Sequence, residues 1–175
     1  TVTTASGKTL SFGGIGNTGA SSSNSVVVNN VTFGAGNLSN TISNNLALPG
    51  TLNLGNITGN GTTGTVTLTI GGAGFTMIGD VANGSGGSLT ALTYSGSGIL
   101  QITPTASAAT NYTGGLNLTG NGTLRVITNG TAANFGGTTG VITLTGGSGS
   151  TGMLDIRTDT GLSVANAIAV VTNSV

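Results

Sequence analysis

Apolar and polar residues alternate along short stretches of this chain, and this period of two constrains the fold more than any other feature. In the stretch 65–70, Val66, Leu68 and Ile70 share one face of an extended chain and three threonines share the other. Similar runs of four to nine residues recur and are bounded by Gly, Asn or Ser. The expected strands are 9–12, 25–33, 65–70, 75–81, 88–94, 98–103, 115–119, 122–127, 141–145 and 152–158. The stretch 162–171 is assigned to a strand rather than a helix because it is rich in β-branched residues.

The connections between these runs decide between fold classes. Two-residue hairpin loops between long strands are not the dominant pattern; short strands follow one another with small polar breaks, such as Thr-Gly-Asn at 119–121. Gly and Asn supply bends with positive φ, and Thr covers the outer pleated faces. The expected fold is an all-β, single-stranded, right-handed parallel β-helix (β-solenoid), one domain over residues 1–175, with roughly 20 residues per coil. A β-sandwich or jelly roll is the alternative.

Charged residues are almost absent, which excludes several classes of function. The chain has three basic and three acidic residues and no His. A nucleic-acid-binding protein needs many Lys and Arg to neutralise phosphates, and no apolar run is long enough for a membrane-spanning helix. Disordered chains combine low hydropathy with high net charge, whereas this chain has zero net charge and a mean hydropathy of +0.33. We therefore expect a folded protein that binds no nucleic acid and is not membrane-embedded.

Residues with catalytic or metal-binding chemistry are equally sparse. The one charge cluster, Asp155, Arg157 and Asp159, shares one face of an expected strand. Four residues of strand place the two carboxylates about 13 Å apart, too far for a glycosidase pair, so we interpret the cluster as an ion-pair ladder. The glycine clusters 13–16 and 71–74 lack the Lys and the following helix of a phosphate loop. Without His or Cys for nucleophilic catalysis, we expect no enzyme activity, no catalytic residue, no cofactor and no metal.

A motif in the second half of the chain points to a known family. Residues 110–126 read T-N-Y-T-G-G-L-N-L-T-G-N-G-T-L-R-V and resemble the autotransporter-associated β-strand repeat, whose signature runs approximately N-T-Y-T-G-G-T-x-V/I-x-x-G-T-L-x-V. Residues 88–102 are similar to the strand that precedes this signature, whereas Leu116 replaces a usual Thr. The resemblance implies a passenger-type β-helix displayed outside a bacterial cell, in families that act as adhesins, surface fibres and scaffolds. The residues that match the motif are Asn111, Tyr112, Thr113, Gly114, Gly115, Gly122, Thr123, Leu124 and Val126.

The two ends of the chain suggest what its partners are. It begins at Thr1 with no initiator Met or signal peptide, so we expect a processed piece of a larger secreted precursor. Solenoids normally carry polar caps, and we expect neither terminus to carry charges that blunt an exposed sheet edge. Copies of the chain are therefore the expected partners, joined head-to-tail or by exchange of residues 1–12. Glycans or other cell-surface components are further candidates because N-x-S/T triplets begin at Asn30, Asn37, Asn56, Asn60, Asn83, Asn111, Asn117, Asn121 and Asn129.

These inferences lead to one principal hypothesis and two alternatives. We expect an extracellular structural protein of the bacterial cell surface that self-assembles into a filament, sheath or surface layer through strand pairing between subunits. The first alternative is a stalk segment of an autotransporter-type adhesin, in which the rod is a spacer. The second is an ice-binding β-solenoid, suggested by the threonine pairs Thr67–Thr69 and Thr143–Thr145. Ice binding needs threonines repeated at one coil length, and their spacing in this sequence is irregular.

Overall fold

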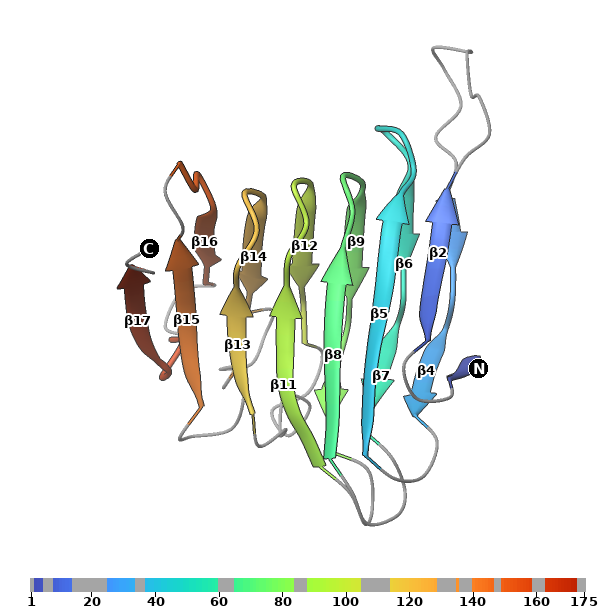
Figure 1. The fold of residues 1–175 in the computed structure, drawn as a ribbon, viewed down its shortest axis with the longest axis horizontal. Coiled ribbons are helices and arrows are strands. Elements are labelled where there is room, and N and C mark those ends of the chain that lie inside the picture. Colours follow the sequence, from blue (N-terminus) through green and yellow to red (C-terminus); the bar gives the residue numbers. More distant parts are fainter. Residues whose placement is uncertain are drawn as a thin grey trace.

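The chain winds into a right-handed parallel β-helix whose walls are three parallel sheets (Figure 1). The computed structural model describes residues 2–4, 8–13, 25–33, 37–59, 65–83, 88–104, 114–128, 135, 140–146, 149–158 and 163–172. Within these residues every regular element is a strand, and each strand pairs in parallel with its neighbours. The expected fold class is therefore confirmed, in place of the sandwich or jelly roll.

The walls contain seven, six and four strands. The seven-stranded sheet consists of β2 (Thr9–Gly13), β5 (Leu38–Asn45), β8 (Thr65–Gly71), β11 (Ser88–Tyr94), β13 (Gly115–Leu118), β15 (Val141–Gly146) and β17 (Ala167–Thr172). The six-stranded sheet consists of β3 (Ser25–Val27), β6 (Thr51–Asn53), β9 (Phe75–Ile78), β12 (Ile99–Ile102), β14 (Thr123–Ile127) and β16 (Met153–Arg157). The four-stranded sheet consists of β1 (Val2–Thr4), β4 (Asn30–Phe33), β7 (Asn56–Thr58) and β10 (Val81–Ala82). In Figure 1 the seven-stranded sheet faces the viewer, the six-stranded sheet lies behind it, and the two termini lie at opposite ends of the stack.

Successive coils stack in register although their lengths differ. Leu68, Leu92 and Leu116 occupy the same position on neighbouring strands and follow one another at equal intervals in the sequence. Nearer the N-terminus, Leu10 pairs with Ile42, and the interval between these two residues is longer. Both intervals exceed the expected coil length of roughly 20 residues, so that expectation is too short. The additional residues lie in the connections, so the strands keep their register.

The core consists of apolar columns that run along the stack, because every second residue of a strand faces inward and parallel register places like positions side by side. Two columns come from the seven-stranded sheet and are named after their last members. The Val170 column is Leu10, Ile42, Ile70, Tyr94, Leu118, Leu144 and Val170. The Ile168 column is Asn40, Leu68, Leu92, Leu116, Ile142 and Ile168.

Two further long columns come from the six-stranded sheet, and Val31, Ile57 and Val81 add a short buried column from the four-stranded sheet. The Leu154 column is Val26, Leu52, Thr76, Leu100, Leu124 and Leu154. The Ile156 column is Val28, Leu54, Ile78, Ile102, Val126 and Ile156. The apolar members in the middle of all four columns are buried, so the hydrophobic effect, at about 25 cal/mol per Å² of apolar surface, acts along the length of the stack.

The segment 38–58 forms three strands, β5, β6 and β7, that the alternation pattern misses. Asn40 and Asn44 take inward positions where the pattern expects apolar side chains. Asn44 is satisfied there: its Nδ2 donates to the Phe75 carbonyl at 2.9 Å and to Thr76 Oγ1 at 3.0 Å, and its Oδ1 accepts from the Leu46 amide at 3.0 Å. Buried amides with partners are compatible with a core, so these strands form despite their polar sequence.

Candidate interaction surfaces

The C-terminal end of the stack is open and apolar. Ile168 and Val170 of β17 continue two core columns, yet they are 50% and 77% exposed because no further described strand covers them. Ile156 of β16, which ends a third column, is 39% exposed. Leu116, two coils earlier in the Ile168 column, and Val126, one coil earlier in the Ile156 column, are fully buried. The end of the stack therefore presents an uncovered section through the core.

A hollow of about 160 Å³ lies beside this end. Leu118, Leu144 and Val170, three successive members of one column, form its apolar wall. Thr145 and Gly146 at the end of β15, together with Gly120, Ser150 and Gly152 from the turns between the sheets, complete the lining. The hollow extends the open end into the space between the last coils.

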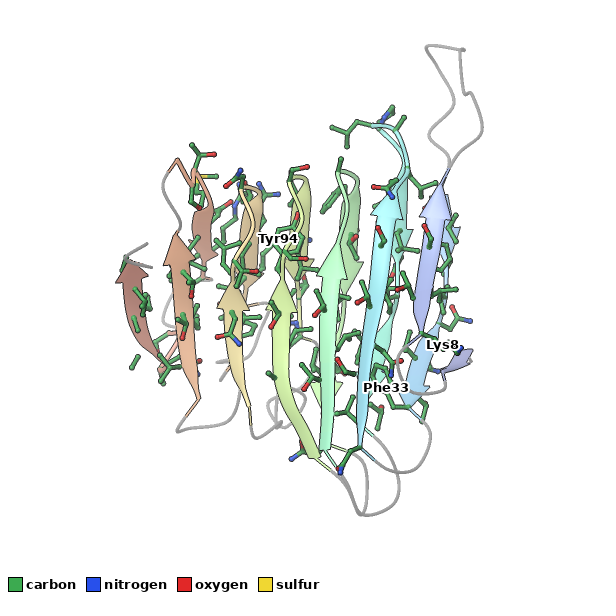
Figure 2. The ribbon with its side chains drawn as sticks, in the orientation of Figure 1. Lys8, Phe33 and Tyr94 are labelled. Carbon is green, nitrogen blue, oxygen red and sulfur yellow. The ribbon has the colours of Figure 1, made fainter. Side chains whose placement is uncertain are left out.

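The N-terminal end of the stack carries a charge at a core-column position, whereas the charges of the C-terminal edge strand β16, Asp155 and Arg157, lie on its outer face. Lys8 directly precedes β2 and is exposed; its amide donates to Asn40 Oδ1 at 3.3 Å and its carbonyl accepts from the Thr41 amide at 3.2 Å (Figure 2). Lys8 therefore lies beside Asn40, at the position that begins the Ile168 column. Because Lys8 lies at this edge, the expectation that neither end carries such a charge is wrong. A charged residue at an edge strand is a known means of discouraging further pairing. The apolar residues of this end, Leu10 and Val26 among them, are half-buried.

The outer face of the seven-stranded sheet is a lattice of hydroxyl groups and small side chains. Thr9, Thr41, Thr69, Thr93, Asn117, Thr143 and Ala169 form one outward column, here called the Thr69 column. Ser11, Ser43, Gly71, Ser95, Thr119, Thr145 and Val171 form the adjacent column. Among the side chains that the structure describes on this face, none is charged and none is aromatic. The spacing that is irregular in the sequence is regular in space, because the connections absorb the differences in coil length.

Three of the charged residues, Arg125, Asp155 and Arg157, gather on the outer face of the six-stranded sheet. Asp155 Oδ2 accepts a hydrogen bond from Arg125 Nε at 2.7 Å and lies 3.1 Å from Arg157 Nη2. Arg125 Nη1 also lies 3.5 Å from Gln101 Oε1, so the cluster crosses β12, β14 and β16 rather than following one strand. The hydrogen bonds from Arg157 and then Arg125 lower the pKa of Asp155 below its ordinary value. The expected pair Asp155–Arg157 is thus present, Arg125 was missed, and Asp159 lies outside the described residues.

The described residues that match the repeat motif divide between two strands, β13 and β14, and the bends that precede them. Asn111, Tyr112 and Thr113 lie outside the described part of the chain, while Gly114 is buried and Gly115 begins β13. Thr123 faces outward on β14, whereas Leu124 and Val126 are core residues. Gly122 lies in the turn before β14, where a Cβ atom would come within 2.4 Å of the Gly98 carbonyl oxygen of the preceding coil. The described members of the motif therefore build the turns and strands of the coil.

Tyr94 is the largest fully buried side chain and lies against these glycine turns (Figure 2). A Cβ atom on Gly96 or on Gly122 would lie 2.8 Å from its hydroxyl oxygen, so the ring fills the space that the glycines leave. The hydroxyl has no hydrogen-bond partner in the described structure. Burial raises the pKa of Tyr94 to about 12, and the nearby Gly98 backbone opposes part of this rise. This tyrosine is a packing residue with an unsatisfied polar atom.

The described residues contain no cluster of three or more side chains of the types that bind metal ions. They also include no helix long and apolar enough to cross a membrane. The described residues form an open apolar end and an outer face lined with hydroxyl groups. Comparisons with protein-family models, with curated proteins and with solved structures find no match to this chain.

Proposed function

We propose that this chain is an extracellular structural protein of the bacterial cell surface that assembles with copies of itself, head-to-tail, into a filament, sheath or surface layer. The observation that carries the proposal is the open C-terminal end, where Ile168, Val170 and Ile156 extend core columns into solvent. Exposed sheet edges and contiguous apolar surface favour association with another chain.

The first coil of a second copy offers a matching surface in three of the four core columns, with Lys8 opposite Ile168 in the fourth. If β17 of one copy pairs with β2 of the next in the register of the stack, Val170 meets Leu10 in the same column. In the six-stranded sheet, Leu154 and Ile156 of β16 then meet Val26 and Val28 at β3. Such a contact is heterologous and repeats without closing, which generates a filament. Head-to-tail stacking is preferred to strand exchange because β2 already pairs with β5 of its own chain.

The scarcity of charge supports assembly over dispersal. A chain with three basic and three acidic residues experiences little repulsion between copies. The resemblance of residues 110–126 to an autotransporter repeat supports display outside a bacterial cell. A structural role also accords with the absence of His and Cys from the sequence, which leaves few groups for catalysis.

Negative-stain electron microscopy of the purified chain tests the proposal, at neutral pH in moderate and in high salt. We expect regular filaments or sheets that persist in high salt, because apolar burial and backbone pairing, unlike ion pairs, are not screened. Dispersed short rods under both conditions would overturn the proposal. They would favour the stalk segment of an adhesin, in which the rod is a spacer.

A further inference from the structure

We infer that the outer face of the seven-stranded sheet binds the ordered water layer at the surface of an ice crystal. The inference starts from the Thr69 column, where the threonines on β2, β5, β8 and β11 stand in register. The sequence interval from Thr9 to Thr41 is longer than the interval from Thr69 to Thr93, yet the four side chains occupy one line. The irregular spacing in the sequence is therefore no objection to ice binding.

The face repeats along the stack through the Thr69 column, which is flanked by Ser39, Thr67, Ala91 and Gly115 on one side and by the Ser11 to Thr119 column, interrupted at Gly71, on the other. Neighbouring members of the Thr69 column are about 4.8 Å apart, and outward residues along one strand, such as Thr67 and Thr69, are about 6.6 Å apart. In Figure 1 the strands of this sheet lie side by side across the stack with little of the twist of an open sheet. A flat sheet of this kind holds its surface groups in a plane over many strands. A planar, repeating array is what a crystalline surface can match.

The hydroxyl groups of this array are rigid and free to bind water. Threonine is β-branched, so its χ1 angle is restricted, and its hydroxyl both donates and accepts hydrogen bonds. The hydroxyls of Thr67, Thr69 and Thr93 form no hydrogen bond with another described residue. By contrast, the hydroxyl of Thr119, at the end of its strand, lies 3.4 Å from the Tyr94 carbonyl oxygen. The hydroxyl groups in the central part of the array thus remain available to bind water. The threonine methyl groups beside them limit the positions that this water can take.

The same composition argues against a protein partner on this face. Protein interfaces depend on aromatic and Arg side chains that fill pockets, and the side chains described on this face include neither. Stacking on sugar rings would likewise need an aromatic surface. Water ordered in a lattice is the ligand whose chemistry, uncharged and both donating and accepting, the array reproduces.

Inhibition of ice recrystallisation and thermal hysteresis by the full chain test this inference. We expect both activities in the unmodified chain and a several-fold loss in Thr69→Tyr and in Thr93→Tyr, because a bulky ring in the middle of the array prevents close approach of the lattice. Thr123→Tyr is the matched control: Thr123 also faces outward from a central coil, but on the six-stranded sheet, so its activity is expected to be unchanged. Circular dichroism and thermal unfolding establish that each variant is folded.

The inference does not depend on self-assembly, and the experiment separates the two. Val170→Asp places a charge on the open end and leaves the Thr69 column intact, so ice activity per chain is expected to remain in this variant. No activity in the unmodified chain would overturn the inference. Equal loss in Thr69→Tyr and Thr123→Tyr would also overturn it, because the hydroxyl array would then not be the active face.

Discussion

At the scale of single residues, the cost of a polar group in this core depends on whether it finds a partner. Asn166 is buried, and its side chain bonds to the Phe135 amide and carbonyl, both at 2.7 Å, and to the Gly140 carbonyl at 2.9 Å. It therefore ties the chain between β14 and β15 to the following coil. The Nδ2 of Asn40 and the hydroxyl of Tyr94, in contrast, are buried without a partner in the described structure. An unsatisfied buried group costs about 1–3 kcal/mol.

Replacing Tyr94 by Phe tests this cost directly. The ring keeps its packing against the glycine turns while the unpartnered hydroxyl is removed. We expect Tyr94→Phe to be as stable as the unmodified protein or more stable by about 1 kcal/mol, measured as the free energy of unfolding in urea. A loss of stability in this variant would mean that the hydroxyl has a partner in solution.

The pH dependence of stability is expected to depend in part on Asp155. A carboxyl group whose pKa is lower in the folded state stabilises the fold above its unfolded pKa, and this contribution is lost as the pH falls through the folded pKa. The pKa of Asp155 is lowered by its hydrogen bonds to Arg157 and Arg125. We expect Asp155→Asn to be slightly less stable than the unmodified protein at pH 7, with the difference shrinking as the pH falls below about 4. Urea unfolding at pH 7 and pH 3 checks this; an equal difference at both would exclude the carboxylate charge as the cause.

At the scale of elements, the alternation pattern predicts strands where the core is apolar and fails where it is polar. β8, β11 and β14 follow from their alternating residues, and the stretch 162–171 contributes to β17 as expected. β5 was missed because Asn40 and Asn44 take inward positions, where Asn44 is satisfied by hydrogen bonds. β6 and β7 were missed because strands of three residues are too short to show an alternation.

The alternation pattern also fails to predict the bends at which the chain passes from one sheet to the next. The expected strand 25–33 is two strands, β3 and β4, because the wall bends between the six-stranded and four-stranded sheets. One coil later, the same bend holds Gly55 at a φ of +59°, where a Cβ atom would lie 1.9 Å from the Asn29 carbonyl oxygen. The close approach of one coil to the next, which no local pattern encodes, decides where a strand ends.

The turns between the seven-stranded and six-stranded sheets depend on the same close approach. A Cβ atom on Gly98 would lie 2.3 Å from the Gly74 carbonyl oxygen of the preceding coil. We expect Gly98→Ala to cost about 3 kcal/mol or more, since backbone atoms must move. Gly146→Ala is the control: the nearest neighbour of its new Cβ atom would be the Ser150 side chain at 3.5 Å, an ordinary contact, and we expect a change below about 0.5 kcal/mol. Similar losses in urea unfolding for both variants would contradict the stacking of the turns.

At the scale of the whole molecule, the fold class could be predicted from the sequence and the surfaces could not. Short alternating runs with small polar breaks are sufficient to indicate a solenoid. The Thr69 column and the ion-pair cluster depend on which residues of different coils meet, and this register is set by connections of unequal length. Arg125 and Asp155 pair across a sequence interval that is longer than the central coil from Leu92 to Leu116. From the sequence spacing alone, Arg125 is therefore not assigned to the ion-pair cluster, and the threonines do not form a regular repeat.

The two ends of the stack make opposite contributions to the proposed assembly. Val170 at the open end is expected to be covered by the next copy, whereas Lys8 places a charge at the position that would meet Ile168. Val170→Asp should abolish association, because a carboxylate would be buried in an apolar contact. Lys8→Ile should strengthen association, because it removes a charge that blunts the edge. Val141→Asp, on the outer face of β15, is the control and should associate as the unmodified chain does.

Sedimentation velocity over a range of protein concentrations tests the proposed assembly most directly. We expect the apparent mass of the unmodified chain to rise with concentration far above the 16.6 kDa of one copy. Val170→Asp should remain near that mass, and Lys8→Ile should assemble at lower concentration. An unmodified chain that stays at the mass of one copy throughout, or a Val170→Asp variant that assembles as well as the unmodified chain, would contradict head-to-tail assembly through the open end.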